Sequence, residues 1–133
     1  IGSGNQGGGE TPGGAENTLW TGNASTQYTR VPVDLQCKYS WNEVNLATHD
    51  VSIKVEFNYE SHYILAEEPV LELYNGWHDK IMSIELNNID ESQHITVTTD
   101  LLEIFKNKQG FKIGGYGINI IKVSVIVTEK QQN

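Results

Sequence analysis

Cysteine and positive charge are both scarce in this chain of 133 residues. Cys37 is the single cysteine, which excludes an internal disulfide framework and a cysteine-based zinc site. Its place in a strand-like run predicts a buried, inert thiol rather than a nucleophile. Acidic residues number 17 against 9 lysines and arginines, and the net charge is -8. Because phosphate groups require a basic footprint, we expect neither nucleic acid nor an anionic membrane as a partner.

Long apolar runs are also missing, since none approaches the ~20 residues that span a bilayer. The chain opens at Ile1 without an initiating Met or an export signal, so we expect an excised piece of a larger protein. Residues 1–16 contain seven glycines and one proline, a composition that predicts a flexible linker. A single domain over residues 17–130 and a tail at 131–133 complete the predicted organisation.

Sequence motifs of catalysis are absent as well. The four histidines show no HExxH or other close ligand spacing, and neither G-x-S-x-G nor a P-loop occurs. Nothing selects one pair of carboxylates for glycoside hydrolysis among the 17 acidic residues. We therefore predict no enzyme activity and no cofactor. The acidic surplus permits a structural calcium, but no ligand loop stands out to support one.

What the chain does have is a repeated β pattern. Residues 51–59 alternate apolar and polar side chains, which is typical of a strand with one buried face. Turn signals, among them Asn75-Gly76 and Gly114-Gly115, separate further strand-like runs. Those runs cover residues 31–37, 70–74, 81–86, 95–98 and 118–127, with a first strand expected around Trp20. Six or more short strands at this spacing predict an all-β sandwich or barrel.

One short helical turn interrupts the β pattern. Asp100 and Glu103 have the spacing of a capping box, and the apolar residues around them would supply a buried side. We expect this turn to end before Gly110.

Aromatic residues in polar company are the most informative feature for function. A pyranose ring has an apolar face of C–H groups, and a flat aromatic ring can stack on it while both surfaces leave water. Trp77 follows the turn Asn75-Gly76 and precedes three polar residues. We therefore expect its indole to be displayed to a ligand rather than packed in a core, with Asn75 hydrogen-bonding to sugar hydroxyls.

Other candidates are less sharply defined by their surroundings. If Leu71 and Leu73 face the core, Glu72 and Tyr74 share the opposite face beside Trp77, where they either bind ligand or are simply wetted. Trp41 lies in a polar loop and is either a stacking platform or a packing residue. Further candidates are Tyr116, which lies between glycines, Tyr63, which follows the long strand in a loop, and Gln27, which lies in a polar stretch. Trp20 is interpreted as structural.

Six short motifs follow one another in a single order along residues 18–127. They are Thr18–Gly22, which is similar to TLWEG, then residues 31–34, Asp50–Val55, Leu71–Trp77, Ile95–Phe105 and Gly115–Val125. Together they resemble a group of β-sandwich carbohydrate-binding modules attached to cellulases and related glycoside hydrolases of gut and rumen bacteria. The resemblance implies a jelly-roll sandwich, a ligand tryptophan at Trp77, and recognition of plant-wall β-glucans, including xyloglucan. The loop over residues 35–48 departs from the family pattern.

The sequence thus predicts a secreted, non-catalytic module with an antiparallel two-sheet sandwich fold. Its expected partners are plant cell-wall polysaccharides (β-1,4-glucan, xyloglucan and mixed-linkage glucan) and a tethered glycoside hydrolase that the module targets. Two alternatives stay open. One is a protein-binding sandwich of the cohesin or adhesin kind, which would use an apolar patch or a sheet edge. The other is a small hydrolase.

Overall fold

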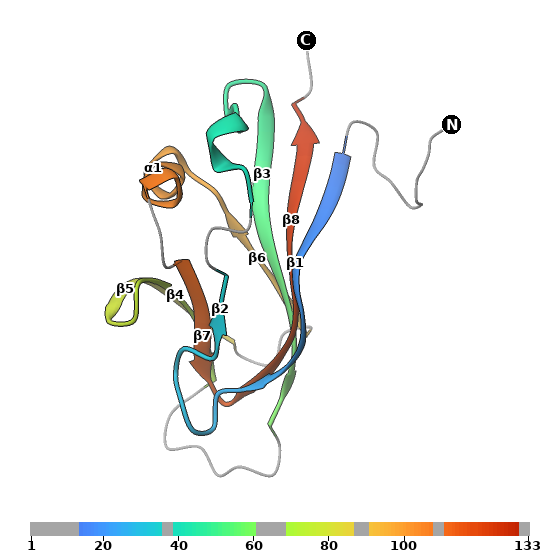
Figure 1. The fold of residues 1–133 in the computed structure, drawn as a ribbon. Helices are drawn as coiled ribbons and strands as arrows, with labels where there is room; N and C mark the ends of the chain where they lie inside the picture. Colours follow the sequence, from blue (N-terminus) through green and yellow to red (C-terminus); the bar gives the residue numbers. More distant parts are fainter. Residues whose placement is uncertain (1–13, 36–38, 61–68, 87–90, 108–110, 131–133) are drawn as a thin grey trace.

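The computed structural model describes residues 14–35, 39–60, 69–86, 91–107 and 111–130 (Figure 1). Within these residues the chain forms strands β1 (Gly14–Ser25), β2 (Val33–Asp34), β3 (His49–Tyr59), β4 (Val70–Asn75), β5 (Asp79–Glu85), β6 (Ser92–Thr96), β7 (Phe111–Tyr116) and β8 (Ile118–Glu129). A 3-10 helix, η2 (Trp41–Glu43), follows β2, and one α-helix, α1 (Thr99–Asn107), follows β6. None of the helices in these residues is long and apolar enough to cross a membrane.

The strands form two antiparallel sheets of four strands each. One sheet has the order β1-β8-β3-β6 and is called the long sheet here, and the other has the order β2-β7-β4-β5 and is called the short sheet. Strands that are consecutive in the sequence mostly alternate between the two sheets, which is the connectivity of a jelly roll. The predicted all-β jelly-roll sandwich is confirmed, and Figure 1 shows the two sheets as separate layers.

The core lies between the two sheets and follows the predicted alternation. Val51, Ile53, Val55 and Phe57 of β3 are all buried, and the polar residues between them point to the outer face. Helix α1 closes one end of the core, where Leu101, Leu102 and Phe105 are buried (Figure 1). The period-two pattern therefore predicted correctly which residues of β3 face the core.

Two predicted boundaries are wrong. Gly114 and Gly115 lie inside β7 rather than in a turn. Glycine is needed at position 114 because the Arg30 backbone approaches β7 so closely that a Cβ would not fit. The helix is capped by Thr98 instead of Asp100. Thr98 Oγ1 accepts a hydrogen bond from the Leu101 amide at 3.2 Å, and α1 starts at Thr99, two residues earlier than a cap at Asp100 allows.

The N-terminal strand begins earlier than the predicted domain start. β1 includes Gly14, whose partner across the sheet is Thr128 of β8. Trp20 of the same strand packs against the core, as the structural interpretation of this residue expected. Cys37 and most of the predicted linker lie outside the described residues.

Candidate ligand-binding face

The outer face of the short sheet displays one large aromatic side chain. Trp77 lies in the turn that joins β4 to β5, and 54% of its surface is exposed. Gly76 before it has a φ of 80°, a left-handed conformation that glycine adopts without a steric penalty. The sharp turn thus lifts the indole out of the sheet and away from the core, as the sequence predicted.

Lys112 of β7 holds this indole from one side. The Lys112 Nζ lies over the ring, 4.8 Å from its centroid, and is also 3.4 Å from Asp34 Oδ2 of β2. Only 2% of Lys112 is exposed. A desolvated ammonium over a tryptophan ring is attracted by the electron-rich π face. The indole is therefore tied to the sheet on the Lys112 side, while much of its surface stays open to solvent.

A buried carboxylate organises the rest of the face. Glu72 of β4 is 1% exposed and accepts hydrogen bonds from Arg30 Nη2 at 2.7 Å, Arg30 Nε at 3.3 Å and Tyr74 Oη at 2.8 Å. Lys80 Nζ of β5 lies 3.4 Å from the same carboxylate. Charge-assisted bonds of this kind fix the geometry of both partners, so Glu72 locks Arg30 and Tyr74 in place.

The titration of Glu72 reflects this setting. Burial alone would raise the pKa of Glu72, but hydrogen bonds from Arg30 and Tyr74 and the charges of Arg30 and Lys80 outweigh burial and hold the pKa below its usual value of 4.5. Burial raises the pKa of Tyr74, and the hydrogen bond to the Glu72 carboxylate raises it further. At neutral pH the carboxylate is therefore ionised and the phenol keeps its proton.

Beside the indole lies a shallow cleft of about 500 Å³. It is lined by Thr29, Arg30, Val31, Tyr74, Trp77 and His78. Arg30 also lies over the ring of Tyr116, with Cζ 5.3 Å from the ring centroid. An aromatic platform, a guanidinium and an imidazole thus converge on one open depression.

Five of the predicted site residues belong to this region. Trp77 is exposed, Asn75 and Tyr116 are partly exposed at the ends of β4 and β7, and Glu72 and Tyr74 point to the same face as predicted. The idea that Glu72 and Tyr74 are wetted is wrong. Both are buried, because the Arg30 side chain folds over the Glu72 carboxylate and because Tyr74 hydrogen-bonds to it.

Of the other three predicted residues, Trp41 and Gln27 do not line the cleft, and Tyr63 cannot be placed. Trp41 is only 3% exposed, and its ring packs 4.6 Å from that of Phe105 and 6.0 Å from that of Phe111. The prediction that Trp41 forms a stacking platform is therefore wrong, since η2 turns its indole into the core. Gln27 lies in the loop between β1 and β2, where its backbone N–H donates a hydrogen bond to Ser25 Oγ. Tyr63 lies outside the described residues.

Sequence reasoning missed the cations that shape the face, which are Arg30, Lys80 and Lys112. For Lys112 a signal existed, because alternation in β7 puts it opposite in direction to Phe111 and Ile113. The double glycine hid that strand. Arg30 lies in a loop without hydrophobic periodicity, and no sequence pattern predicts its pairing with Glu72.

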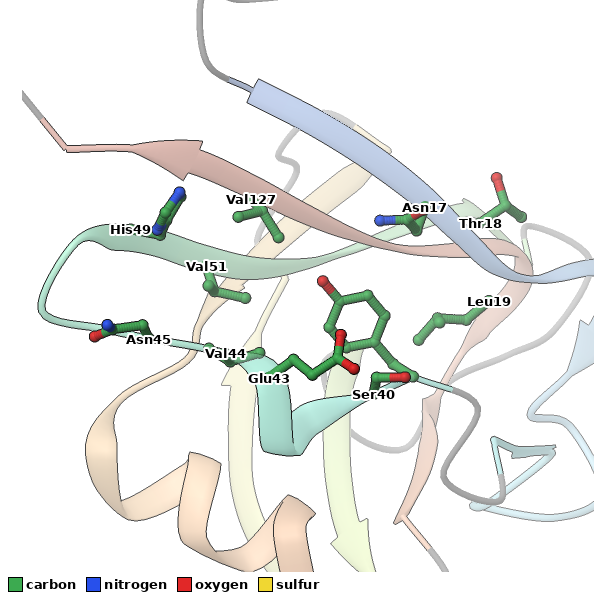
Figure 2. A pocket seen from close by; sticks show the side chains of 11 residues that line it. Asn17, Thr18, Leu19, Ser40, Glu43, Val44, Asn45, His49, Val51 and Val127 are labelled. Carbon is green, nitrogen blue, oxygen red and sulfur yellow. The ribbon is translucent and has the colours of Figure 1, made fainter.

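A second depression lies at the end of the sandwich where η2 approaches the long sheet, and Figure 2 shows it from close by. It has a volume of about 550 Å³ and shares no lining residue with the cleft beside Trp77. Among the described residues, no group of three or more histidine, cysteine, aspartate or glutamate side chains could hold a metal ion.

Comparison with known proteins finds similarity in structure alone. No protein-family model matches the chain, and no curated protein matches it in sequence. A solved structure of SGBP-B, from the mixed-linkage glucan utilization locus of Bacteroides ovatus and in complex with a mixed-linkage heptasaccharide, is similar with a TM-score of 0.60 and 19% identity. The match covers 83% of this chain and 30% of the SGBP-B chain, so this chain spans less than a third of that protein.

A second solved structure is a carbohydrate-binding module of the endoglucanase Cel5A from Eubacterium cellulosolvens. It has a TM-score of 0.46 and 14% identity, over 88% of this chain and 100% of that one. At these identities the comparisons concern the fold, and the similarity to SGBP-B agrees with the β-sandwich described above.

Proposed function

We propose that this protein is a non-catalytic carbohydrate-binding module that binds plant cell-wall β-glucans on the outer face of the short sheet. The observation that carries the proposal is the Trp77 indole, which is 54% exposed and contacts Lys112 on one side. A tryptophan of this size normally leaves water, so displaying it has a cost that a stacked ligand would offset.

The first step of recognition is stacking on Trp77. With Lys112 over the ring, the indole orientation is set before a ligand arrives. A β-linked glucan presents flat faces of equatorial rings whose axial C–H groups point at the platform. Pre-organisation matters here because an immobile ring loses less conformational entropy on binding than a free one.

The second step is hydrogen bonding to the sugar hydroxyls by the polar groups around the cleft. The candidate donors are Arg30 and His78, which line the cleft with Trp77, and Asn75, which ends β4 two residues before Trp77. Glu72 is occupied by its partners, so its role in this proposal is to hold Arg30 at the cleft rather than to touch the ligand. Tyr116 would act through its contact with Arg30.

Three further observations support β-glucan as the ligand. The sandwich is similar in fold to SGBP-B, whose structure contains a mixed-linkage heptasaccharide. The motif resemblance independently includes xyloglucan among the expected targets. A neutral glycan also meets no repulsion from a chain of net charge -8. We propose β-1,4-glucan, mixed-linkage glucan and xyloglucan as the ligands, bound with micromolar to millimolar constants, or ~4 to 8 kcal/mol.

The biological role that follows is targeting. In this proposal the module belongs to a secreted protein that also carries a glycoside hydrolase, and binding raises the concentration of substrate near that enzyme. A modest affinity is sufficient, because once the module is bound, the encounter between the tethered enzyme and the polysaccharide becomes intramolecular.

Affinity electrophoresis in gels that contain soluble polysaccharides tests the proposal. We expect retardation by mixed-linkage glucan and xyloglucan, and loss of most of it in Trp77→Ala, at least ~1 kcal/mol. Lys106→Ala, an exposed change on α1, serves as the matched control and should migrate like the wild type. Absence of retardation by β-glucan, xyloglucan, xylan and mannan alike would contradict sugar binding and favour a protein partner. Release of reducing sugar from the same polysaccharides would contradict a non-catalytic role.

A further inference from the structure

The depression in Figure 2 has the composition of a ligand pocket and is distinct from the Trp77 face. β1, β3 and β8 of the long sheet bound it on one side, and η2 with its flanking residues bounds it on the other (Figure 2). Its volume of about 550 Å³ falls within the range of small-molecule sites. Leu19, Val44, Val51 and Val127 form its apolar part.

The aromatic wall of this pocket is rigid. Tyr39 is half-buried and its ring meets Trp41 edge-on, with 4.8 Å between centroids and an interplanar angle of 65°. Trp41 is itself fixed in the core against Phe105. Burial raises the pKa of Tyr39, and the nearby Glu43 carboxylate raises it further, so the phenol keeps its proton and can donate a hydrogen bond.

Polar groups around the pocket are suited to hydroxyl ligands. The pocket is lined by Asn17, Thr18, Ser40, Glu43, Asn45 and His49 in addition to its apolar part and Tyr39. Asn45 Oδ1 accepts a hydrogen bond from the Ala47 amide at 2.9 Å, which fixes the side chain. Because Oδ1 takes this bond, the Asn45 side chain can offer its Nδ2 donors to a ligand, and the Glu43 carboxylate lines the same pocket as an acceptor.

The charge of the pocket narrows the class of ligand. Among the residues that the structure describes, no lysine or arginine lines it, and its one carboxylate is Glu43. An anionic ligand would therefore meet repulsion from Glu43. Neutral vicinal hydroxyls can instead donate to a carboxylate and accept from amides, while the ring C–H groups pack on Tyr39. A depression of about 550 Å³ has room for one or two pyranose rings, which suits the end of a glycan chain.

We propose that this pocket is a second binding site that accepts the terminal one or two sugar units of a neutral glycan. It goes beyond the Trp77 face and does not depend on it. One module would then contact a glycan along its length on the short sheet and at a chain end beside η2. Two sites in one molecule raise avidity toward a polysaccharide surface that offers both features.

The test is an NMR titration of the ¹⁵N-labelled protein with cellobiose, in the wild type and in Trp77→Ala. We expect saturable shifts at the amides of Asn17, Ser40 and Asn45 in both proteins, because removal of Trp77 leaves the pocket intact. Shifts at the pocket that vanish in Trp77→Ala would overturn the independence of the site. Absence of pocket shifts at tens of millimolar cellobiose, with the Trp77 face still responding, would overturn the site while leaving the proposed function standing.

Pocket variants supply the second part of the test. Ser40 is exposed and its side chain makes no capping bond to η2, so Ser40→Trp fills the pocket without removing a structural contact. We expect it to abolish the pocket shifts, and Thr18→Trp on β1 provides a second filler if η2 is disturbed. Glu43→Gln keeps an acceptor oxygen but removes its charge, so it should weaken cellobiose binding at least about fivefold, because hydrogen bonds to a charged group are roughly twice as strong as neutral ones. Equal binding of glucuronate would contradict a neutral ligand.

Discussion

The outer faces of the two sheets are built differently. On the long sheet, Lys122 lies 3.7 Å from Glu16 and 4.0 Å from Glu56, and all three side chains are between 30% and 42% exposed. On the short sheet, Glu72 is 1% exposed and binds Arg30 at 2.7 Å. Solvated pairs of the first kind contribute little to stability, commonly ~0 to 1 kcal/mol. Buried networks of the second kind are sensitive to the loss of any one member.

The aromatic residues follow the same division. Among the described residues, only Tyr28 and Trp77 are large apolar side chains with high exposure, and neither lies in a strand of the long sheet. Trp77 lies on the short sheet, and Tyr28 lies in the loop that also carries Arg30. The exposed Trp77 ring and the buried ionic network therefore occur on the same face, which is the face that we propose for recognition.

The largest effect expected from this comparison concerns one glycine in each sheet. A Cβ added at Gly114 of β7 would lie 1.7 Å from the Arg30 backbone oxygen, which also accepts a hydrogen bond from the Gly115 amide at 2.8 Å. Gly114→Ala should therefore displace the Arg30 loop and destabilise the fold by ~2 to 3 kcal/mol or more, while abolishing glucan retention. Urea unfolding and affinity electrophoresis measure the two effects.

The matched change in the long sheet is Gly22→Ala. There the added Cβ would meet the Trp20 side chain at 2.9 Å, and a partly buried ring at the sheet edge can shift. We expect ~1 kcal/mol or less and no change in retention. Equal stability of Gly22→Ala and Gly114→Ala would show that close approach of the Arg30 loop to β7 is not a feature of the folded protein.

The next effect compares one carboxylate on each face. Glu72→Gln keeps the shape of the side chain but leaves Arg30 and Lys80 without their anion. Removal of one partner from a fully buried pair costs ~3 to 5 kcal/mol. Because the Arg30 and Lys80 side chains are 42% and 49% exposed and can be solvated, we expect ~2 kcal/mol. Glu56→Gln on the long sheet should change the free energy of unfolding by less than ~0.5 kcal/mol, and similar losses in both would remove the distinction between the faces.

The pH dependence of stability sharpens the same point. In the folded protein the pKa of Glu72 lies below its usual value of 4.5, so its contribution to stability is complete above that value and is lost as the pH falls through the folded pKa. Urea midpoints of the wild type should therefore fall on acidification below about pH 4.5 by more than those of Glu72→Gln. Parallel curves for the two proteins would indicate that Glu72 is not held ionised by its neighbours.

How far the sequence predicted this molecule depended on which interactions decide each feature. Local alternation decides strands such as β3, and the sandwich followed from it. A turn with glycine before tryptophan decides the exposure of Trp77, and that prediction also agrees with the structure. Trp41 has equally polar neighbours in the sequence, yet η2 turns it toward Phe105 and Phe111. The burial of Trp41 depends on contacts with residues more than sixty positions away, which the local composition cannot predict.

The ionic network shows the same limit. Glu72 and Tyr74 were placed on one face by alternation alone, but their burial depends on Arg30, which is 42 residues away in the chain. The loop that positions Arg30 is held by backbone contact with Gly114 and Gly115. Those glycines were interpreted as a turn because close backbone approach and chain reversal leave the same signature in a sequence. Long-range pairing decided which of the two applied.

The smallest expected effect separates recognition from stability, and it compares one lysine on each sheet. Lys112→Met retains an apolar contact with Trp77 but removes the charge that lies 4.8 Å from the ring centroid. The change also takes the cation from Asp34, but Asp34 is 31% exposed and can be solvated, and loss of the buried Lys112 charge removes a desolvation cost. Stability should therefore change by less than ~1 kcal/mol. Glucan affinity should fall about two- to fivefold, the range of a partly desolvated cation–π contact, and the fluorescence anisotropy of Trp77 should report a more mobile ring.

Lys122→Met on the long sheet is the control for this last change, because it also removes one positive charge from an acidic chain. Its affinity for mixed-linkage glucan should equal that of the wild type. If both lysine variants weaken binding equally, the loss reflects net charge and not the orientation of the indole. If only Lys112→Met does so while its unfolding midpoint is unchanged, the ammonium acts by holding Trp77 in its binding position. Lys112 would then contribute to glucan affinity on the short sheet without touching the glucan.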